Sequence, residues 1–432
     1  MAEDRLIKKV LIITPHFPPS NLAAVHRSRL FAQHLPSFGW EPIILTVDEK
    51  FYEEKLDYNL LQLVPKDLKI EKVNAFRVSK PRMIGDIGLR GFFQLYKKAK
   101  AIIAQQKVDF VYIPIPSFYT ALLGRWLFAK TKVPYGIDYI DPWVHSQPRG
   151  KKLFSRHWFS ERLSNFLEPI AIKNASMITG VAEGYYEGVK IRNPYLVNKA
   201  VFGAMPYGGE KLDHQQIQSI KVQPYLFQKK EGKVQLVYGG AMLPKAFAPL
   251  ECIFSAINES REFFKNLEIH FIGTGKSPND PVGYNIKPIA EKYGLWEDII
   301  YEYPSRIPYL DVLVHLDNAA GVFILGSTEP HYTPSKVYQG VLSAKPLFAI
   351  LHKASTAVNV IRNARAGVVL SFDGEAELSL IKEHFKESFE SFVMFMQHFD
   401  PKNVDMEIFD QYSAKSVTAK LADLLNQSLN KN

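Results

Sequence analysis

Residues 333–349 bring together the residue types most suited to chemistry in this chain. The segment predicts a loop containing Thr333, a helix that begins at Ser335, and then a buried strand. Ser335 is a residue type that caps helix N-termini, and Lys336 beside it adds a positive charge. The free amides of a first helical turn attract anions together with the helix dipole. The pattern therefore predicts a binding site for a diphosphate.

A second set of polar residues follows the first predicted strand of the second half of the chain. That strand, at residues 234–238, leads into a turn with Gly240 and a loop with Lys245. In open parallel sheets, ligands bind in the loops at the carboxyl ends of the strands. Lys245 and Lys336 would supply two positive charges to a diphosphate, which aids catalysis in any reaction where negative charge develops on it in the transition state. We predict that both lysines are catalytic.

The first half of the chain offers candidates for binding a second substrate. The loop after its first strand contains His16 and leads to His26 and Arg27, and a later strand is followed by Asp141 and Trp143. A carboxylate at a strand end can accept a hydrogen bond from an acceptor hydroxyl or act as its base. We therefore predict that Asp141 is catalytic. The other candidates for contacts with this second substrate are His16, His26, Arg27 and Trp143.

The alternation of apolar runs and polar-faced helical stretches predicts two α/β domains, each with a parallel sheet covered on both faces. The expected domains are residues 1–210 and 233–411, with a linker at 211–232 and a last helix at about 412–429. A chain of 432 residues supports this division, since one core seldom organises so many. The predicted strands lie at residues 10–14, 42–47, 110–115, 135–140, 177–181 and 200–204, and then at 234–238, 268–272, 299–303, 320–325, 346–350 and 367–372.

These segments resemble the retaining glycosyltransferases of family 4, which have the GT-B fold. The Pro-Ser-Lys at residues 334–336 and the Lys-Pro at 345–346 are similar to the donor-phosphate motif of that family, and residues 8–19 are similar to its opening strand and loop. Arg27 and the Asp-Pro-Trp at 141–143 are similar to one branch of it. The resemblance implies two Rossmann-like doubly wound domains facing a central cleft, with the donor on the second and the acceptor on the first. It also implies that the last helix packs back on the first domain.

Several positions depart from the family pattern. Its two Glu residues, which are separated by seven others, correspond here to His331 and Gln339, and Ala241 stands where an Arg is usual. The amide of Gln339 can still hydrogen-bond ribose hydroxyls, and Glu329 can take the place of the first Glu. The resemblance assigns donor binding to Gly240, Glu329, His331, Thr333, Ser335, Lys336 and Gln339.

The resemblance further implies a hexosyltransferase or related glycosyltransferase of class EC 2.4. It would move a sugar from a nucleoside-diphosphate donor to a lipid-linked or polysaccharide precursor, with retention and without a metal or other cofactor. The residues themselves also predict no metal site, because the histidines are scattered along the sequence and Cys252 is the single cysteine. Two alternatives stay open: a catalytically degenerate nucleotide-sugar-binding or scaffold protein, motivated by the missing carboxylates, and a nucleotide-sugar 2-epimerase, which shares the architecture.

The net charge of +9 indicates an anionic partner or a solvated basic face. Residues 149–159 mix basic and aromatic side chains, as segments at membrane interfaces do, so an anionic membrane surface is one expected partner. No nucleic-acid-binding motif is present in the sequence, and no nucleic acid is expected. The single cysteine and the lack of a spanning or signal-peptide run predict a cytoplasmic protein, soluble or peripheral on the inner face of the cytoplasmic membrane.

Overall fold

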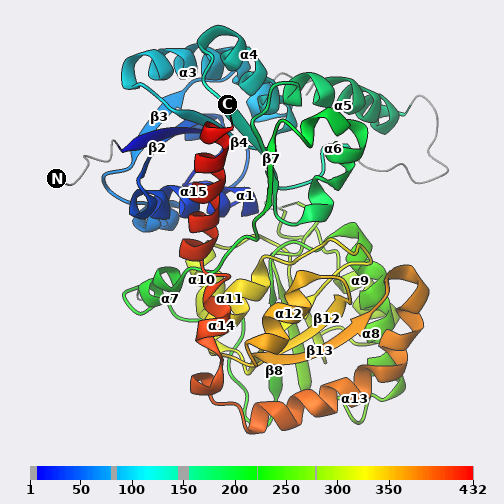
Figure 1. Cartoon of the computed structure of the whole chain (residues 1–432). Coiled ribbons are helices and arrows are strands. Elements are labelled where there is room, and N and C mark those ends of the chain that lie inside the picture. Colours follow the sequence, from blue (N-terminus) through cyan, green and yellow to red (C-terminus); the bar gives the residue numbers. More distant parts are fainter. Residues whose placement is uncertain (1–6, 79–84, 145–154, 221, 278–279, 432) are drawn as a thin grey trace. The chain divides into compact units, whose positions relative to one another are not determined.

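The computed structural model describes residues 7–78, 85–144, 155–220, 222–277 and 280–431, except for the side chains of Arg156 and His157. The chain forms two units, of which unit 1 comprises Met1–Tyr207 and Ala414–Asn432 and unit 2 comprises Gly208–Ser413. Each unit is a Rossmann-like parallel sheet with helices on both faces, as the sequence predicts (Figure 1).

Unit 1 contains seven parallel strands in the order β3-β2-β1-β4-β5-β6-β7, so the chain begins in the middle of the sheet. β3 is absent from the sequence prediction because its Lys-Ile-Glu-Lys-Val sequence has few apolar side chains, and it lies at the sheet edge with no buried residue. The strands are β1 (Lys8–Ile13), β2 (Trp40–Val47), β3 (Lys69–Val73), β4 (Phe110–Pro114), β5 (Tyr135–Tyr139), β6 (Met177–Gly180) and β7 (Val201–Ala204).

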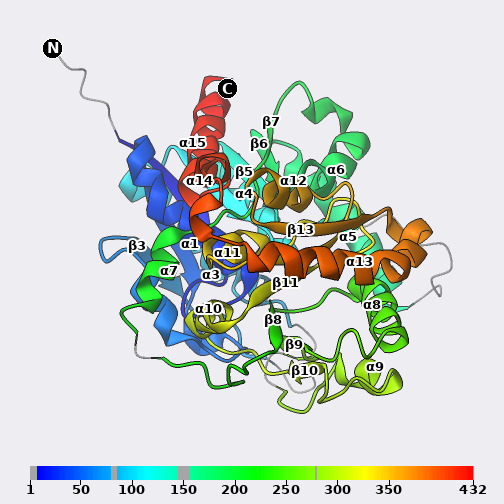
Figure 2. The ribbon, with the colours of Figure 1, turned by 90° about the horizontal axis from the view of Figure 1, so that it is seen from below.

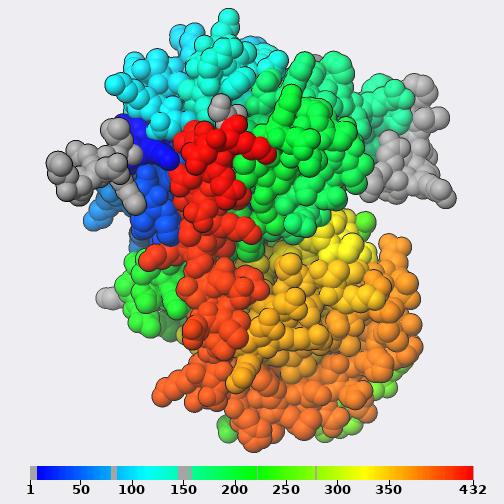
Figure 3. Space-filling view, viewed as in Figure 1, coloured from blue at the N-terminus to red at the C-terminus, as the bar shows by residue number. Residues whose placement is uncertain are grey.

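Helices cover the two faces of this sheet from different parts of the chain. Successive side chains of a strand point to opposite faces, and in β1 the side chains of Leu11 and Ile13 pack under α3, α4 and α5, whereas Val10 and Ile12 pack under α1 and α15. Figure 3 shows α15, in red, on the surface of unit 1. The helices are α1 (Ala23–His34), α2 (Ile87–Arg90), α3 (Phe92–Gln106), α4 (Ala121–Thr131), α5 (Arg156–Ile172), α6 (Glu187–Arg192) and α15 (Ala414–Asn430).

Unit 2 repeats the plan with six parallel strands in the order β10-β9-β8-β11-β12-β13. They are β8 (Val234–Gly239), β9 (Leu267–Ile272), β10 (Ile300–Tyr303), β11 (Gly321–Leu325), β12 (Leu347–His352) and β13 (Gly367–Phe372). The helices are α7 (Lys211–Ile217), α8 (Phe247–Glu259), α9 (Lys287–Lys292), α10 (Tyr309–Asn318), α11 (Lys336–Leu342), α12 (Thr356–Asn363), α13 (Leu378–Gln397) and α14 (Met406–Asp410). The longest, α13, runs beside β13 (Figure 2). None of the helices that the structure describes is long and apolar enough to cross a membrane.

The stretch expected to be a linker, residues 211–232, belongs to unit 2 and opens with α7. Further along, Nε2 of the buried His315 accepts the backbone amides of Tyr225 and Leu226, both at 3.2 Å. The ring of Phe227 then stacks on His270, with 4.1 Å between centroids. A polar composition suggested a linker, but specific contacts with two buried histidines hold this segment against the unit 2 core.

The chain passes between the units twice, at Tyr207–Gly208 and at Ser413–Ala414. Within unit 2 the two passages are neighbours, since the amide of Gly209 donates a hydrogen bond of 2.9 Å to the carbonyl of Tyr412. The last helix therefore leaves unit 2 beside the point where the chain first enters it.

A fully buried ion pair holds the first passage on the unit 1 side. Arg27 Nε and Nη2 donate to the Asp138 carboxylate at 2.6 and 3.0 Å, and Nη1 donates to the carbonyls of Met205 and Pro206 at 2.8 and 2.9 Å. Burial alone would lower the pKa of Arg27, but the Asp138 carboxylate outweighs it and raises that pKa. These contacts connect α1 to β5 and to the last residues of the first segment of unit 1.

Replacing Arg27 with Met should destabilise unit 1, because it leaves the Asp138 carboxylate buried without its cation. We expect a loss in the free energy of unfolding of about 3–5 kcal/mol. The matched control is Arg261→Met, which breaks the exposed 2.7 Å pair with Asp298 and should cost below about 1 kcal/mol. Urea unfolding followed by circular dichroism measures both, and equal losses would contradict an organising role for Arg27.

Candidate functional site

The centre of the unit 2 sheet is the expected place for a ligand. The chain leaves β8 toward β9 on one side, whereas β11 lies on the other side of β8. The loops after β8 and β11 therefore begin next to each other at the carboxyl edge and lead in different directions, which is the geometry of ligand sites in sheets of this kind. Gly240, directly after β8, has a φ of +100°, a conformation that only glycine adopts readily.

Lys336 opens α11 and reaches back over the end of β8. Its Nζ lies 3.5 Å from the carbonyl oxygen of Ala241 and 3.5 Å from the centre of the Tyr238 ring. Loss of surrounding water lowers the pKa of Lys336 to about 7. An anion bound beside this ammonium would favour its charged form and offset that loss. Lys336, which the sequence predicted for this site, is thus a basic side chain whose charged form would be stabilised by a bound anion.

The start of α11 differs from the expectation of a capped helix. The helix begins at Lys336, and Ser335 has a helical backbone with φ −58° and ψ −26°. The Ser335 side chain makes no capping hydrogen bond, and the helix has only seven residues. Any affinity for an anion here rests on the lysine and the neighbouring loops more than on a helix terminus.

Lys245 connects the loop after β8 to the loop after β11. Its Nζ lies 3.2 Å from Oε1 of Glu329, and its carbonyl accepts the amide of Thr328 at 3.2 Å. Because more than half of the Lys245 side chain is exposed, this ion pair contributes little to stability. The structure thus brings Gly240, Lys245, Glu329 and Lys336 to one edge of the unit 2 sheet.

Three other predicted donor residues lie in or after the same loop. Thr333 is buried, and its hydroxyl lies 2.8 Å from that of Thr356. His331 is half-buried. Gln339 lies one turn into α11, and its Oε1 accepts a hydrogen bond of 2.8 Å from Nε2 of His214 on α7. Burial lowers the pKa of His214, although the contact with Gln339 partly opposes this. Their donor-binding roles stay predictions.

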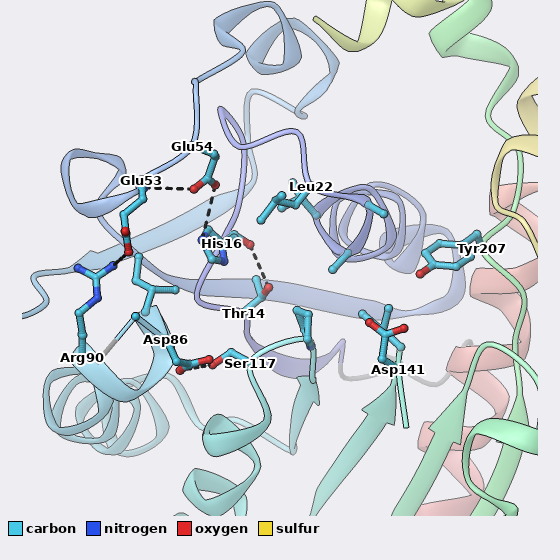
Figure 4. Close-up of a pocket in the computed structure, with 17 residues that line it drawn as sticks. Thr14, His16, Leu22, Glu53, Glu54, Asp86, Arg90, Ser117, Asp141 and Tyr207 are labelled. Atoms are coloured by element: carbon cyan, nitrogen blue, oxygen red, sulfur yellow. Dashed lines mark hydrogen bonds and ion pairs between the residues drawn. The ribbon is translucent and has the colours of Figure 1, made fainter. Parts of the chain in front are cut away.

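Unit 1 contains a cavity of about 340 Å³ at the corresponding edge of its own sheet, shown in Figure 4. Its walls come from the segments after β1, β2, β3, β4 and β5, including the start of α1 and helix α2, and from Tyr207 after β7. They lie around the point where β1 separates β2 from β4. The polar residues that line it are Thr14, His16, Glu53, Glu54, Asp86, Arg90, Ser117, Asp141 and Tyr207.

One end of this cavity holds a histidine among carboxylates. His16 Nε2 lies 3.5 Å from Glu54 Oε1, and that carboxylate accepts a 2.5 Å hydrogen bond from Ser20. Burial lowers the pKa of His16, and the charges of Glu54 and Asp86 only partly oppose it. A neutral imidazole beside carboxylates accepts hydrogen bonds from hydroxyl groups. Figure 4 shows Asp141 and Tyr207 at the other end of the cavity.

The predicted acceptor residues divide into two groups. His16 and Asp141 line the cavity, whereas His26, Arg27 and Trp143 are not among its lining residues. Arg27 is engaged by Asp138 and two carbonyls, and the buried Trp143 stacks on Phe118 with 5.8 Å between centroids. Contacts of those three residues with an acceptor stay predictions, and for Arg27 and Trp143 the structure supports an organising role.

The sequence analysis did not predict four residues that lie in the unit 1 cavity or beside Lys336 and Gln339, namely Glu54, Asp86, Tyr238 and His214. Glu54 could have been predicted, because it is a carboxylate in the loop after a predicted strand. Asp86 follows the unpredicted β3, and His214 lies in the supposed linker. In the described part of the chain, no group of three or more His, Cys, Asp or Glu side chains is placed to hold a metal ion.

Comparison with solved structures extends along nearly the whole chain. A glycosyltransferase from Rickettsia africae aligns with 98% of this chain and 99% of its own, at 12% identity and a TM-score of 0.62. Anabaena Alr3699/HepE in complex with UDP and glucose aligns with 97% of this chain and 100% of its own, at 13% identity and a TM-score of 0.61. A sucrose-phosphate synthase from Thermosynechococcus elongatus aligns with 97% of this chain and 98% of its own, at 11% identity and a TM-score of 0.62.

These identities are low, so the likeness establishes the fold. The chain has the two-domain Rossmann-like architecture of GT-B glycosyltransferases. No protein-family model matches the chain, and no curated protein sequence does.

The low pKa of Lys336 predicts a pH-dependent affinity for a nucleoside diphosphate such as UDP. The anion needs the charged ammonium, so affinity should fall about tenfold as the pH rises from about 6 to about 8.5. In Lys336→Arg the side chain stays charged, and the fall should largely disappear. Isothermal titration calorimetry measures this, with Lys245→Arg as the control that keeps the wild-type profile. An identical profile in Lys336→Arg would contradict the role of Lys336.

The contact between Gln339 and His214 predicts the outcome of restoring a carboxylate. In Gln339→Glu, the new carboxylate should pair with His214 and raise its pKa, so UDP affinity should change by less than about threefold. In the double variant Gln339→Glu/His214→Phe, the carboxylate is free for ribose hydroxyls and binding should tighten by about tenfold. Calorimetry gives the affinities, and NMR titration gives the His214 pKa. Full tightening in the single variant would show that His214 does not compete.

Proposed function

We propose that this chain is a glycosyltransferase that moves a sugar from a nucleoside-diphosphate donor held by unit 2 to a hydroxyl of an acceptor held by unit 1. The proposal includes retention of anomeric configuration and independence from metal ions and other cofactors. Its fold is that of solved glycosyltransferases, and one of them, HepE, is described in complex with UDP and glucose.

The observation that carries the proposal is the position of Lys336 at the switch point of the unit 2 sheet. Its partly desolvated ammonium lies over the end of β8, and Lys245 lies in the loop that follows β8. A nucleoside diphosphate leaving a sugar develops charge on its outer phosphate. Cations already in place stabilise that charge without reorganisation and take the part that a divalent ion has in other enzymes.

The unit 1 cavity suits a neutral, hydroxyl-bearing part of an acceptor. Glu54, Asp86 and Asp141 accept hydrogen bonds from sugar hydroxyls, and they disfavour a phosphate in the same space. We assign Asp141 to the reacting hydroxyl and His16 to a neighbouring one. The proposed acceptor is the sugar end of a lipid-linked or polysaccharide precursor, and the proposed location is the cytoplasm, at the inner face of the cytoplasmic membrane.

A binding or scaffold protein of the same fold is the second candidate, and Gln339 favours it. The family's carboxylate is missing at this position, and the amide oxygen is held by His214. Such a protein would bind the donor without turning it over.

Incubation with a panel of nucleotide sugars tests the proposal and separates it from this candidate. For a donor that raises the melting temperature, we expect slow release of the nucleoside diphosphate, since transferases hydrolyse donor when water replaces the acceptor. Lys336→Ala should lower that release by about a hundredfold. The control Lys386→Ala, on α13, should leave it unchanged.

The other outcomes are equally informative. A thermal shift without release would favour the binding protein. If no nucleotide sugar shifts the melting temperature, the assignment of unit 2 as a donor domain is wrong.

A further inference from the structure

Helix α5 exposes a row of apolar side chains along its outer face. Phe159, Leu163, Phe166 and Ile170 are all exposed, and Phe166 has 66% of its surface accessible. Their spacing of four, three and four residues places them on one side of a helix. A surface helix of a water-soluble domain normally turns such a row inward, so this face calls for an apolar partner.

The acidic side chains of α5 point inward, whereas a basic side chain is exposed on its outer face. Its two carboxylates are buried, and Glu168 accepts hydrogen bonds from Arg192 at 2.6 Å and from Tyr139 at 3.3 Å. Arg162, by contrast, is exposed beside the apolar row, with its guanidinium 4.6 Å from the Trp158 ring centre. The outer face of α5 therefore combines large apolar side chains with positive charge.

The neighbouring helices α3 and α4 extend this face. All three helices cover the same side of the unit 1 sheet, and α4 packs against both α3 and α5 (Figure 1). Phe93 on α3 is 65% exposed, and Trp126 on α4 is exposed and contacts Phe92 edge-on. Neither α3 nor α4 contains an acidic residue, and together they contribute Lys97, Lys100, Arg125 and Lys130, whereas Lys98 on α3 pairs with Glu71 of β3 at 2.7 Å. We call the outer surface of these three helices the α3–α5 face.

We propose that the α3–α5 face binds an anionic phospholipid membrane at its interface. Phe93, Trp126 and the α5 row would enter the boundary between headgroups and acyl chains, and the lysines and arginines would meet the lipid phosphates. Aromatic rings favour that boundary, and basic side chains beside it add attraction to anionic lipids. An acidic protein partner would explain the charge but not so long an apolar row.

This surface adds to the basic segment predicted from the sequence. Residues 149–154 of that segment lie outside the described residues, so the proposal rests on α3, α4 and α5. Phe93 lies three residues after Arg90, which lines the unit 1 cavity. A membrane bound at this face would lie near the cavity in which we propose that an acceptor binds.

Sedimentation with vesicles tests the proposal without any nucleotide, so its outcome is independent of the proposed transfer reaction. The wild-type chain should bind vesicles of phosphatidylcholine with phosphatidylglycerol, bind pure phosphatidylcholine weakly, and lose affinity with added salt. The variant Leu163→Gln/Phe166→Gln/Ile170→Gln should bind anionic vesicles at least about tenfold more weakly. The variant Lys97→Gln/Lys100→Gln/Arg162→Gln should lose roughly fivefold for each charge.

Matched controls come from unit 2. Val282→Gln/Met394→Gln/Ile408→Gln removes exposed apolar side chains, and Lys265→Gln/Lys386→Gln/Lys402→Gln removes exposed charges; both should bind as the wild type does. Circular dichroism establishes that each variant is folded. Unchanged binding in the α5 variant, or equal binding to both vesicle types, would overturn the proposal. A lipid-free dimer that the α5 variant converts to monomers would instead identify this face as a contact between copies of the chain.

Discussion

The candidate sites of this protein depend on one constraint, namely that all strands of each sheet run in the same direction. Parallel strands bring their carboxyl ends to a single edge, so the loops after them share that edge. Each sheet also starts near its middle, at β1 in unit 1 and at β8 in unit 2, with neighbours on both sides. The chain continues from each of these strands to a neighbour on one side and later adds a strand on the other side. The loops at this point diverge, which leaves space for a ligand. The cavity beside His16 in unit 1 and the site around Lys336 in unit 2 are the two results.

The same plan produces opposite electrostatic environments in the two units. Around the half-buried Lys336, partial loss of water leaves a cation whose surroundings offer a carbonyl and an aromatic ring. Around His16, the carboxylates of Glu54 and Asp86 come from two loops, and burial lowers the pKa of the histidine. A diphosphate suits the first environment, and sugar hydroxyls suit the second. This difference follows from side chains at equivalent strand ends, so the chemistry of each unit is determined by its loops.

Most of the fold was predictable because buried parallel strands are continuous apolar runs, as in the Val-Leu-Ile-Ile of β1 and the Leu-Phe-Ala-Ile-Leu of β12. β3 was not predicted, because an edge strand with half-exposed side chains needs no continuous apolar run. The positions of Lys245, His16 and Asp141 after strands, and of Lys336 at the start of a helix, were predictable because polar residues follow apolar runs there, and their roles stay predictions. The partnership of Gln339 with His214 joins residues 125 positions apart, and no local pattern encodes it. For Arg27 the resemblance implied an acceptor contact, which stays a prediction, and no local pattern showed that its side chain forms a buried ion pair with Asp138.

Hydrogen exchange of the wild-type chain with and without UDP tests the central claim most directly, because it locates the nucleotide on the sequence. The account predicts slower exchange in residues 239–246 and 326–340, the loops after β8 and β11, as the bound diphosphate restrains their backbone. Saturating UDP that protects only the unit 1 cavity loops, around residues 14–22 and 115–117, or neither pair of loops, would contradict the assignment of unit 2 as the donor-binding unit.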